Sequence, residues 1–128
     1  MRIDEALVAE MVAHAREDFR DECCGLVAKR GDEAVEVRRM ENLAHTWMKF
    51  EMDGLSVLRA LNEFEEAGLE LGAIYHSHTK TEPYPSQTDI NFAAGWPGVE
   101  WIIIGLKSRD GEPTVRTYLI EDGNVREI

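Results

Sequence analysis

The chain has 128 residues, the length of about one ordinary domain. Hydrophobic residues make up 44% and charged residues 30% of it, a globular composition that argues against a disordered or fibrous chain. The 25 acidic residues outnumber the 14 Lys and Arg, and the net charge of -11 has the wrong sign for binding nucleic-acid phosphates or an anionic membrane. We therefore expect one domain over residues 1–128, with no nucleic-acid and no membrane partner.

The N-terminus and the cysteines predict a cytoplasmic protein. The first residues include Asp4 and Glu5 and no apolar run of the kind found in signal peptides, and no stretch is long enough to cross a bilayer. The two cysteines, Cys23 and Cys24, are adjacent, and neighbours rarely form a relaxed disulfide with each other. A reducing compartment fits this usage.

The first half of the chain predicts a helix, a hairpin and a second helix. Apolar residues recur at helical spacing near the N-terminus, then alternate along two short segments joined by a turn, and return to helical spacing after an irregular stretch. The expected elements are a helix from Asp4 to Phe19, strands at 25–28 and 34–40, an irregular segment at 42–51, and a helix from Asp53 to Gly68.

The second half predicts four more strands and one short helix. The expected elements are a strand at 69–75 that continues into two histidines, a loop at 79–85, a helix at 86–94, a strand at 99–106, and a hairpin of 114–120 with 125–128. The order of elements along the chain predicts an α/β fold, with a single mixed β-sheet flanked by helices.

The segment around the two histidines contains the residues that carry chemistry. Side chains of a strand alternate between its faces, so His76 and His78 share one face about 6.6 Å apart. Ser86 and Asp89 are three residues apart on the next helix and lie on one side of it. Two imidazoles and one carboxylate, with a fourth position open, are typical of a catalytic zinc site.

Each half of this pattern also has a structural explanation. A single histidine near a strand end is commonly a half-exposed polar residue, and two on one face make that explanation weaker. Ser86 and Asp89 alone fit a helix capping box, in which the serine oxygen and the carboxylate each accept a backbone N–H. The joint spacing favours the metal site.

The whole pattern resembles the signature of a known family. His76-x-His78, then seven residues, Ser86, two residues and Asp89 is similar to the motif of the JAMM, or MPN+, zinc metalloproteases. The segment Glu22 to Gly25 resembles the acidic motif that this family has after its first helix. Residues 11–16 and 75–79 are most similar to the bacterial CysO-cysteine peptidase branch. Enzymes of that branch release cysteine from the C-terminal glycine of a small ubiquitin-like sulfur carrier.

The resemblance implies a JAMM/MPN-like (cytidine-deaminase-like) architecture and one Zn²⁺ per chain. It implies that His76, His78 and Asp89 bind the zinc, that Glu22 is the general acid and base, and that Ser86 assists. Elementary chemistry agrees with these roles. Zinc lowers the pKa of water to about 7, a carboxylate can carry the proton to the leaving amine, and a hydroxyl can donate to the oxyanion.

The sequence departs from the family pattern in two places. Thr79 stands where many members have a proline, and the seven residues between His78 and Ser86 leave no room for the segments of linkage-selective deubiquitinases. Four further residues either line a groove for an extended Gly-Gly tail or belong to the core, and both explanations stay open: Asn42, Trp47, Phe50 and Tyr84.

The cysteines are not expected to take part in the reaction. Cys24, which is followed by Gly25 at the start of a strand, suits tight packing. Cys23 on the opposite side of that strand would be exposed and open to oxidation, and its role stays open.

We therefore expect a zinc-dependent peptidase or isopeptidase. It would hydrolyse the amide after the C-terminal glycine of a ubiquitin-like or sulfur-carrier protein and release cysteine or a lysine-linked product. The alternative is a non-catalytic MPN-type scaffold that binds a ubiquitin-like partner. A zinc nucleobase deaminase lacks support because its His-x-Glu and Pro-Cys-x-x-Cys elements are missing, and a Cys–His peptidase would depend on Cys24.

Overall fold

A computed structural model describes residues 1–128, and all of its strands belong to one sheet. The six strands lie in the order β2-β1-β3-β4-β5-β6. Only β3 and β4 are parallel, and the other neighbours are antiparallel, so the predicted mixed sheet is confirmed. The strands are β1 (Cys24–Arg30), β2 (Glu33–Met40), β3 (Glu70–His78), β4 (Glu100–Gly105), β5 (Thr114–Glu121) and β6 (Asn124–Glu127).

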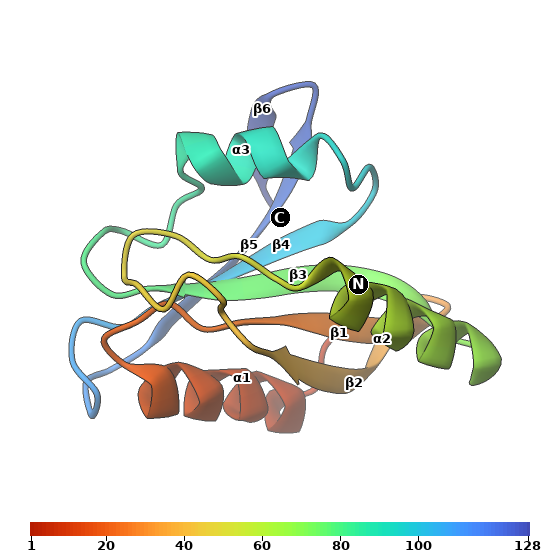
Figure 1. The fold of residues 1–128 in the computed structure, drawn as a ribbon, viewed down its shortest axis with the longest axis horizontal. Helices are drawn as coiled ribbons and strands as arrows, with labels where there is room; N and C mark the ends of the chain where they lie inside the picture. The colour runs from red at the N-terminus through yellow and green to blue at the C-terminus, as the bar shows by residue number, and fades with distance from the viewer.

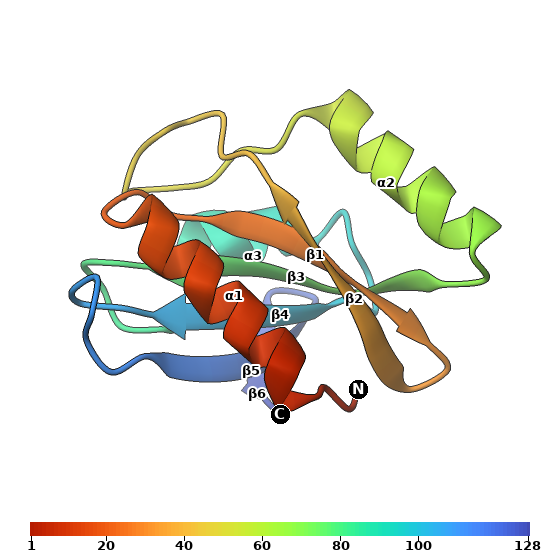
Figure 2. The same cartoon turned by 90° about the horizontal axis from the view of Figure 1, so that it is seen from below.

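Three helices cover the two faces of this sheet. They are α1 (Glu5–Asp18), α2 (Gly54–Glu66) and α3 (Gln87–Ala93). Helix α1 lies against one face, and α2 and α3 lie against the other (Figures 1 and 2). Each helix begins after an N-cap side chain that accepts a backbone N–H, namely Asp4, Asp53 and Ser86. These are the three helix starts that the sequence predicts.

Alternating side chains of the central strands form a hydrophobic cluster on each face. In β3, Tyr75 packs on the α1 side with Met11, whereas Ile74 packs on the other side with Phe64 and Trp101. Burying one large apolar side chain contributes about 1.5–3 kcal/mol, so the two clusters hold the helices onto the sheet. The alternation also directs His76 toward the side covered by α2 and α3.

The parallel pair places the predicted site residues at one end of the molecule. Because β3 and β4 run in the same direction, their connection must cross the sheet, and α3 makes that crossing. The end of β3 and the beginning of α3 therefore lie at the same end of the sheet, at left in Figure 1. His78 and Ser86 belong to these two places.

A close approach beside β3 requires a glycine. A Cβ atom at Gly25 would lie 2.2 Å from the ring of Tyr75, so a larger residue could not stand there without moving that ring.

None of the three helices is both long and apolar enough to cross a membrane.

Candidate metal centre

Two imidazoles and one carboxylate converge at the end of β3. The Nε2 atoms of His76 and His78 lie 3.1 Å apart, and the Oδ2 atom of Asp89 lies 3.1 Å from the first and 3.4 Å from the second. Tetrahedral zinc with bonds of about 2.0–2.1 Å would require its ligand atoms to be about 3.3 Å apart. The three atoms therefore have the spacing that one small cation needs.

The hydrogen bonds around the centre orient two of these groups. Nδ1 of His78 lies 2.8 Å from the carbonyl of Glu82, and in the neutral imidazole a proton on Nδ1 would leave the lone pair of Nε2 free to bind a metal. Oδ2 of Asp89 accepts the backbone N–H of Ser86 at 2.9 Å. Partners of this kind fix the tautomer of a ligand histidine and the orientation of a ligand carboxylate.

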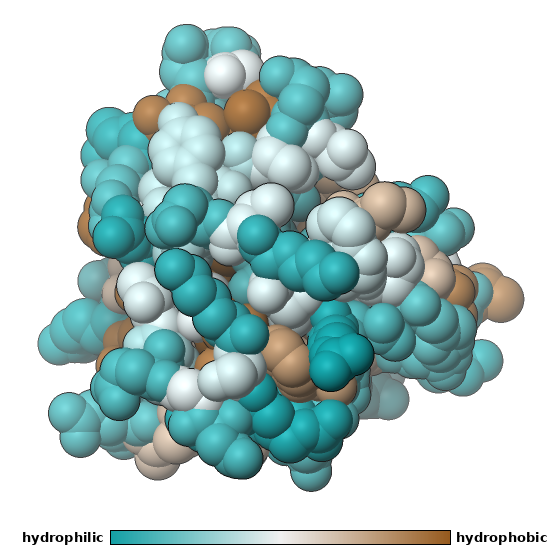
Figure 3. Space-filling model, turned by 90° about the vertical axis from the view of Figure 1, so that its left-hand side faces the viewer, coloured by the Kyte–Doolittle hydropathy of each residue, from teal (hydrophilic) through white to brown (hydrophobic).

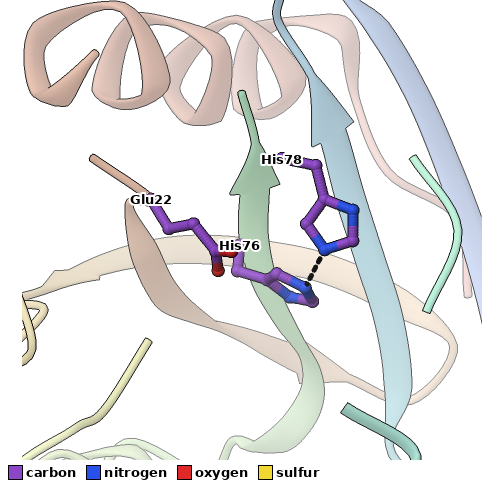
Figure 4. Close-up of side chains that lie close together, drawn as sticks. All are labelled: Glu22, His76 and His78. Carbon is purple, nitrogen blue, oxygen red and sulfur yellow. Dashed lines mark hydrogen bonds between the residues drawn. The ribbon is translucent and has the colours of Figure 1, made fainter. Parts of the chain in front are cut away.

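Glu22 lies beside the same two histidines. Its carboxylate and the two imidazoles offer ligand atoms within 4.8 Å of one another. In Figure 4, Glu22 extends from the segment before β1 toward His76 and His78. One of its oxygens, Oε1, is buried and has no hydrogen-bond partner. Burial raises the pKa of Glu22 to about 8, so this group can both accept and donate a proton near neutral pH.

The two buried carboxylates differ in charge. Burial alone would raise the pKa of Asp89, but hydrogen bonds from His76 and His78 outweigh it and hold that pKa far below its ordinary value. Asp89 is therefore a permanent anion, which suits a metal ligand, whereas Glu22 with its raised pKa suits proton transfer.

The two histidines also differ. Burial lowers the pKa of His76, which keeps its imidazole neutral, the form that binds metals. Burial would lower the pKa of His78 too, but its hydrogen bonds to Asp89 and to the carbonyl of Glu82 raise it overall.

Ser86 forms the capping box that was one of the two explanations of its spacing. Its Oγ accepts the backbone N–H of Asp89 at 3.1 Å, and the carboxylate of Asp89 accepts the N–H of Ser86. The hydroxyl of Ser86 acts only as an acceptor in this cap, so its proton remains available to a group at the centre.

Asn42 is a buried residue. Its Nδ2 donates to the carbonyls of Glu22 at 2.9 Å and Lys49 at 3.1 Å. Its Oδ1 accepts the N–H groups of Ala44 and Glu51. Asn42 also lines a cavity together with Glu22, so the two explanations for Asn42, core and groove, both stay predictions. Through these hydrogen bonds the Asn42 side chain connects the backbone of Glu22 to the irregular segment between β2 and α2 (residues 42–52). The sequence pattern does not predict these contacts.

Of the three other predicted groove residues, Phe50 contacts the centre, and Trp47 and Tyr84 are exposed. Phe50 packs on His76 with 4.7 Å between the ring centroids, and it lines a small pocket with Ser86 and Asp89. Trp47 is 40% exposed, and Nζ of Lys80 lies 4.6 Å from its ring centroid. This contact joins the segment 42–52 to the loop after β3.

Tyr84 lies further along that loop. It is 55% exposed, and its ring meets the edge of Tyr118. Its side chain is accessible to a bound chain, as are those of Trp47 and, in part, Phe50.

The cysteines are both buried and free. The expected exposure of Cys23 is wrong, because this residue packs beneath α1 with Met11 and Tyr75, and its N–H donates to Oγ of Ser77. Burial raises the pKa of Cys23 and of Cys24 to about 12. A thiol with such a pKa is a poor nucleophile at neutral pH, which argues against a peptidase based on Cys24.

Comparisons with known proteins agree with this geometry. The family model for prokaryotic homologues of the JAB domain matches residues 4–120. The CysO-cysteine peptidase of Mycobacterium tuberculosis is 35% identical over 123 residues, which cover 94% of this chain and 83% of that protein. The probable TtuB-protein conjugate cleaving protease of Thermus thermophilus is 35% identical over 122 residues, covering 94% of this chain and 76% of that protein.

Solved structures show the same fold. A protein from Desulfitobacterium hafniense superimposes with a TM-score of 0.85 and 30% identity, covering 98% of this chain and 88% of that one. A JAB1/MPN domain protein from Archaeoglobus fulgidus has a TM-score of 0.65 and 18% identity, with coverage of 100% and 96%. The chain therefore belongs to the prokaryotic JAB-domain family, within the JAMM/MPN group that its sequence resembles.

Proposed function

We propose that this protein is a zinc-dependent peptidase that acts on a ubiquitin-like or sulfur-carrier protein with a C-terminal Gly-Gly. It hydrolyses the amide after the last glycine and releases cysteine or a lysine-linked product. The observation that carries the proposal is the convergence of His76, His78 and Asp89, with three ligand atoms 3.1–3.4 Å apart, beside the protonatable Glu22. A non-catalytic scaffold does not need two imidazoles and a carboxylate that converge beside a protonatable group, so this arrangement favours the peptidase over the scaffold.

The proposed zinc ligands are His76, His78 and Asp89. Zinc held there supplies Lewis acidity, which lowers the pKa of water and polarises a carbonyl. The charge of this site also suits a cation. The anionic Asp89 lies beside two imidazoles, and burial of all three side chains excludes most solvent, which strengthens the attraction between the carboxylate and a metal ion.

Glu22 carries the proton in the proposed reaction. Its carboxylate takes a proton from the attacking water while the water oxygen bonds to the glycine carbonyl carbon. It then gives that proton to the nitrogen as the C–N bond breaks, so the products are a carboxylic acid, which ionises in water, and an amine. The backbone of Glu22 is held on both sides by the segment 42–52, since its N–H donates to Thr46 and its carbonyl accepts from Asn42.

Ser86 stabilises the charge that develops on the carbonyl oxygen. Its Oγ accepts from Asp89, which fixes the position of the hydroxyl, and the free proton can donate to the oxyanion. Such a donor strengthens its bond only in the transition state, so it accelerates the chemical step.

The substrate class is supported by the relatives and by the surroundings of the centre. The names of two relatives refer to CysO-cysteine and to TtuB-protein conjugates. Phe50 offers partly exposed aromatic surface against His76, and Trp47 and Tyr84 add exposed aromatic side chains that an extended Gly-Gly tail could contact. Both cysteines are free, which fits the cytoplasm as the compartment.

The experiment that tests this function uses defined conjugates. The zinc-loaded protein is incubated with carrier–cysteine and with carrier–lysine peptide adducts, and the products are weighed by mass spectrometry. We expect a mass loss at the bond after the terminal glycine. Glu22→Gln should retain about one zinc per chain, while turnover falls by about 10²- to 10⁴-fold.

The control is Glu65→Gln, the same change at an exposed acidic residue of α2. It should keep wild-type turnover. Intact adducts after incubation with zinc-loaded wild-type protein would rule out the peptidase and leave the scaffold.

A further inference from the structure

An acidic cavity lies beside Glu22, at the end of the molecule that holds the candidate metal centre. It has a volume of about 310 Å³, and its wall comes from residues 14–22 and 40–45, at the left of Figure 1. Figure 3 looks onto this end of the molecule, where hydrophilic side chains cover most of the surface. Six of the eight residues in the wall carry a carboxylate or an imidazole: His14, Asp18, Asp21, Glu22, Glu41 and His45.

The exposure of these side chains falls from the surface toward the centre. Glu41 and His45 are exposed, Asp18 and Asp21 are partly buried, and Glu22 is only 4% exposed. The carboxylate of Glu22 and the two ligand histidines offer ligand atoms within 4.8 Å of one another. Oε1 of Glu22 is buried and has no hydrogen-bond partner. The cavity therefore ends at a carboxylate that has an unused oxygen and adjoins the centre.

The wall of the cavity carries negative charge and no cationic Lys or Arg side chain. Its two imidazoles lie near its own carboxylates. Nε2 of His14 is 3.3 Å from Asp18, and Nε2 of His45 is 3.8 Å from Glu41. A cleft lined by one sign of charge concentrates the counter-ion and raises association rates by about 10- to 10³-fold. Carboxylates and imidazoles are also ligands of zinc, so this wall both attracts a divalent cation and can bind it.

A second cavity beside the centre is unsuited to a cation in water. Its volume is about 10 Å³, the space of about one water molecule. Its wall includes Ser86 and Asp89, the rings of Phe50 and Phe92, and the positively charged Lys49. A divalent cation in water carries several water molecules, and the lysine repels it. Of these two cavities, only the acidic one has both the size and the charge to admit a hydrated metal ion.

We propose that the acidic cavity is the route by which the metal ion enters the centre. A buried metal site needs an entry path, and the side chains along this wall can replace the water molecules of the ion one after another. Glu22 is the last of them and passes the ion to His76 and His78, where Asp89 completes the ligand set. This inference rests on the ligands named in the proposed function, and it gives Glu22 a function in metal loading besides proton transfer.

The test measures how fast metal-free protein takes up zinc. The protein is mixed rapidly with Zn²⁺ at low ionic strength, and the free ion is followed with a colorimetric indicator. The decisive variant combines Asp21→Asn with Glu41→Gln, which removes two charges from the wall and none from the centre. We expect its uptake rate to fall by about 10-fold. Its zinc content at equilibrium should stay near one per chain, because the ligands are intact.

The matched control combines Glu65→Gln with Glu66→Gln on α2. It changes the net charge by the same amount at exposed positions, and it should take up zinc at the wild-type rate. Added salt should slow the wild-type protein more than the wall variant, because salt screens charges that face solvent. Phe92→Ala widens the small cavity and should leave the uptake rate unchanged.

The possible results separate this inference from the peptidase, because uptake is measured without a substrate. An unchanged rate in the wall variant, or an equal loss of rate in the control, overturns the inference. Faster uptake by Phe92→Ala also overturns it and places the entry at the small cavity. Slow uptake by the wall variant supports the inference even if the wild-type protein cleaves no conjugate, in which case only the peptidase fails. A wild-type protein that binds no zinc contradicts the proposed ligands and the entry route together.

Discussion

Among single residues, burial distinguishes two acidic side chains from all the others. Of 25 Asp and Glu residues, only Glu22 and Asp89 are buried. Burying a charged carboxylate without a partner costs free energy, and the two residues avoid this cost in opposite ways. Asp89 keeps its charge because two imidazoles and a backbone N–H surround it, whereas Glu22 has a raised pKa and one oxygen without a partner.

Composition alone could not have identified either residue. Asp89 is predictable from its spacing to Ser86, because three residues on a helix share one side. Glu22 is predictable only through the resemblance of its segment to a family motif. Its contacts with Thr46 and Asn42 join positions 20 or more residues apart, and no local pattern encodes them.

A third buried group, His14, links α1 to β3. Its Nδ1 lies 2.7 Å from the hydroxyl of Tyr75, and its Nε2 lies 3.3 Å from Oδ2 of Asp18. The neutral imidazole can accept from Tyr75 and donate to Asp18 at the same time. Burial lowers the pKa of His14, although Asp18 opposes this shift.

This lowered pKa predicts how stability depends on pH. Below about pH 6.5 the unfolded chain binds a proton at His14 that the folded protein resists, so the free energy of unfolding falls as the pH decreases through that range. Protonation would also turn Nδ1 into a donor and leave the hydroxyl hydrogen of Tyr75 without its acceptor.

The measurement is urea unfolding of the wild-type protein and His14→Gln between pH 7.5 and 5. The variant should be less stable at pH 7.5 by about 1–3 kcal/mol, because Tyr75 loses its buried partner. It should also lose less stability on acidification than the wild-type protein. His45→Gln is the control for the loss of an imidazole at an exposed position. Parallel curves for the wild-type protein and His14→Gln would contradict the assignment.

Among the elements, α3 combines a structural and a chemical function in its first turn. The Ser86 to Asp89 capping box begins the helix and also presents the carboxylate to the histidines of β3. The two explanations of this spacing are therefore compatible. The same four residues fix where the helix starts and how Asp89 is oriented.

Ser86→Ala separates these two contributions. Loss of an N-cap costs about 0.5–2 kcal/mol of stability, and loss of an oxyanion donor costs about 10²- to 10³-fold in turnover. We expect both effects, with bound zinc retained because the ligands remain. The readouts are the unfolding free energy, the turnover of a carrier–cysteine conjugate and the zinc content.

The matched control is Asp53→Ala, which removes the N-cap of α2, whose carboxylate accepts the N–H of Ser56 at 3.1 Å. It should reduce stability by a similar amount and leave turnover unchanged. If Ser86→Ala behaves in the same way, Ser86 is a cap alone.

Regular elements were predictable in order and type, and the irregular ones were not. Periods of two and of about 3.6 residues reveal strands and helices in the sequence, and all nine elements are present. The segment 42–52 has no period, and its conformation depends on four hydrogen bonds of the Asn42 side chain. The prediction that Cys23 is exposed was wrong for a related reason. Helix α1 covers the segment before β1, and this long-range contact leaves no pattern in the local sequence.

For the whole molecule, the sheet order explains why the centre forms where it does. Four of the five strand pairs are antiparallel, and only β3 and β4 are parallel. The crossing through α3 brings a strand end and a helix start together, and β1 beside β3 adds the segment that contains Glu22. Glu22 lies far along the chain from the three proposed ligands in the segment 76–89, and it meets them only when β1 pairs with β3 in the sheet. Metal binding should therefore be linked to the folding of the whole protein.

Removal of the metal should lower the melting temperature of the whole molecule. A ligand at 100 times its Kd stabilises the folded state by about 2.7 kcal/mol, which corresponds to roughly 10 °C for a chain of this size. The measurement is calorimetry after treatment with a chelator, followed by titration with zinc. Asp89→Asn, which removes a proposed ligand, should make the melting temperature insensitive to zinc, whereas Asp122→Asn in the turn between β5 and β6 should respond like the wild-type protein. A wild-type melting temperature that zinc does not change would contradict the assignment of His76, His78 and Asp89 as ligands, because no ion that binds only the folded state can leave its stability unaltered.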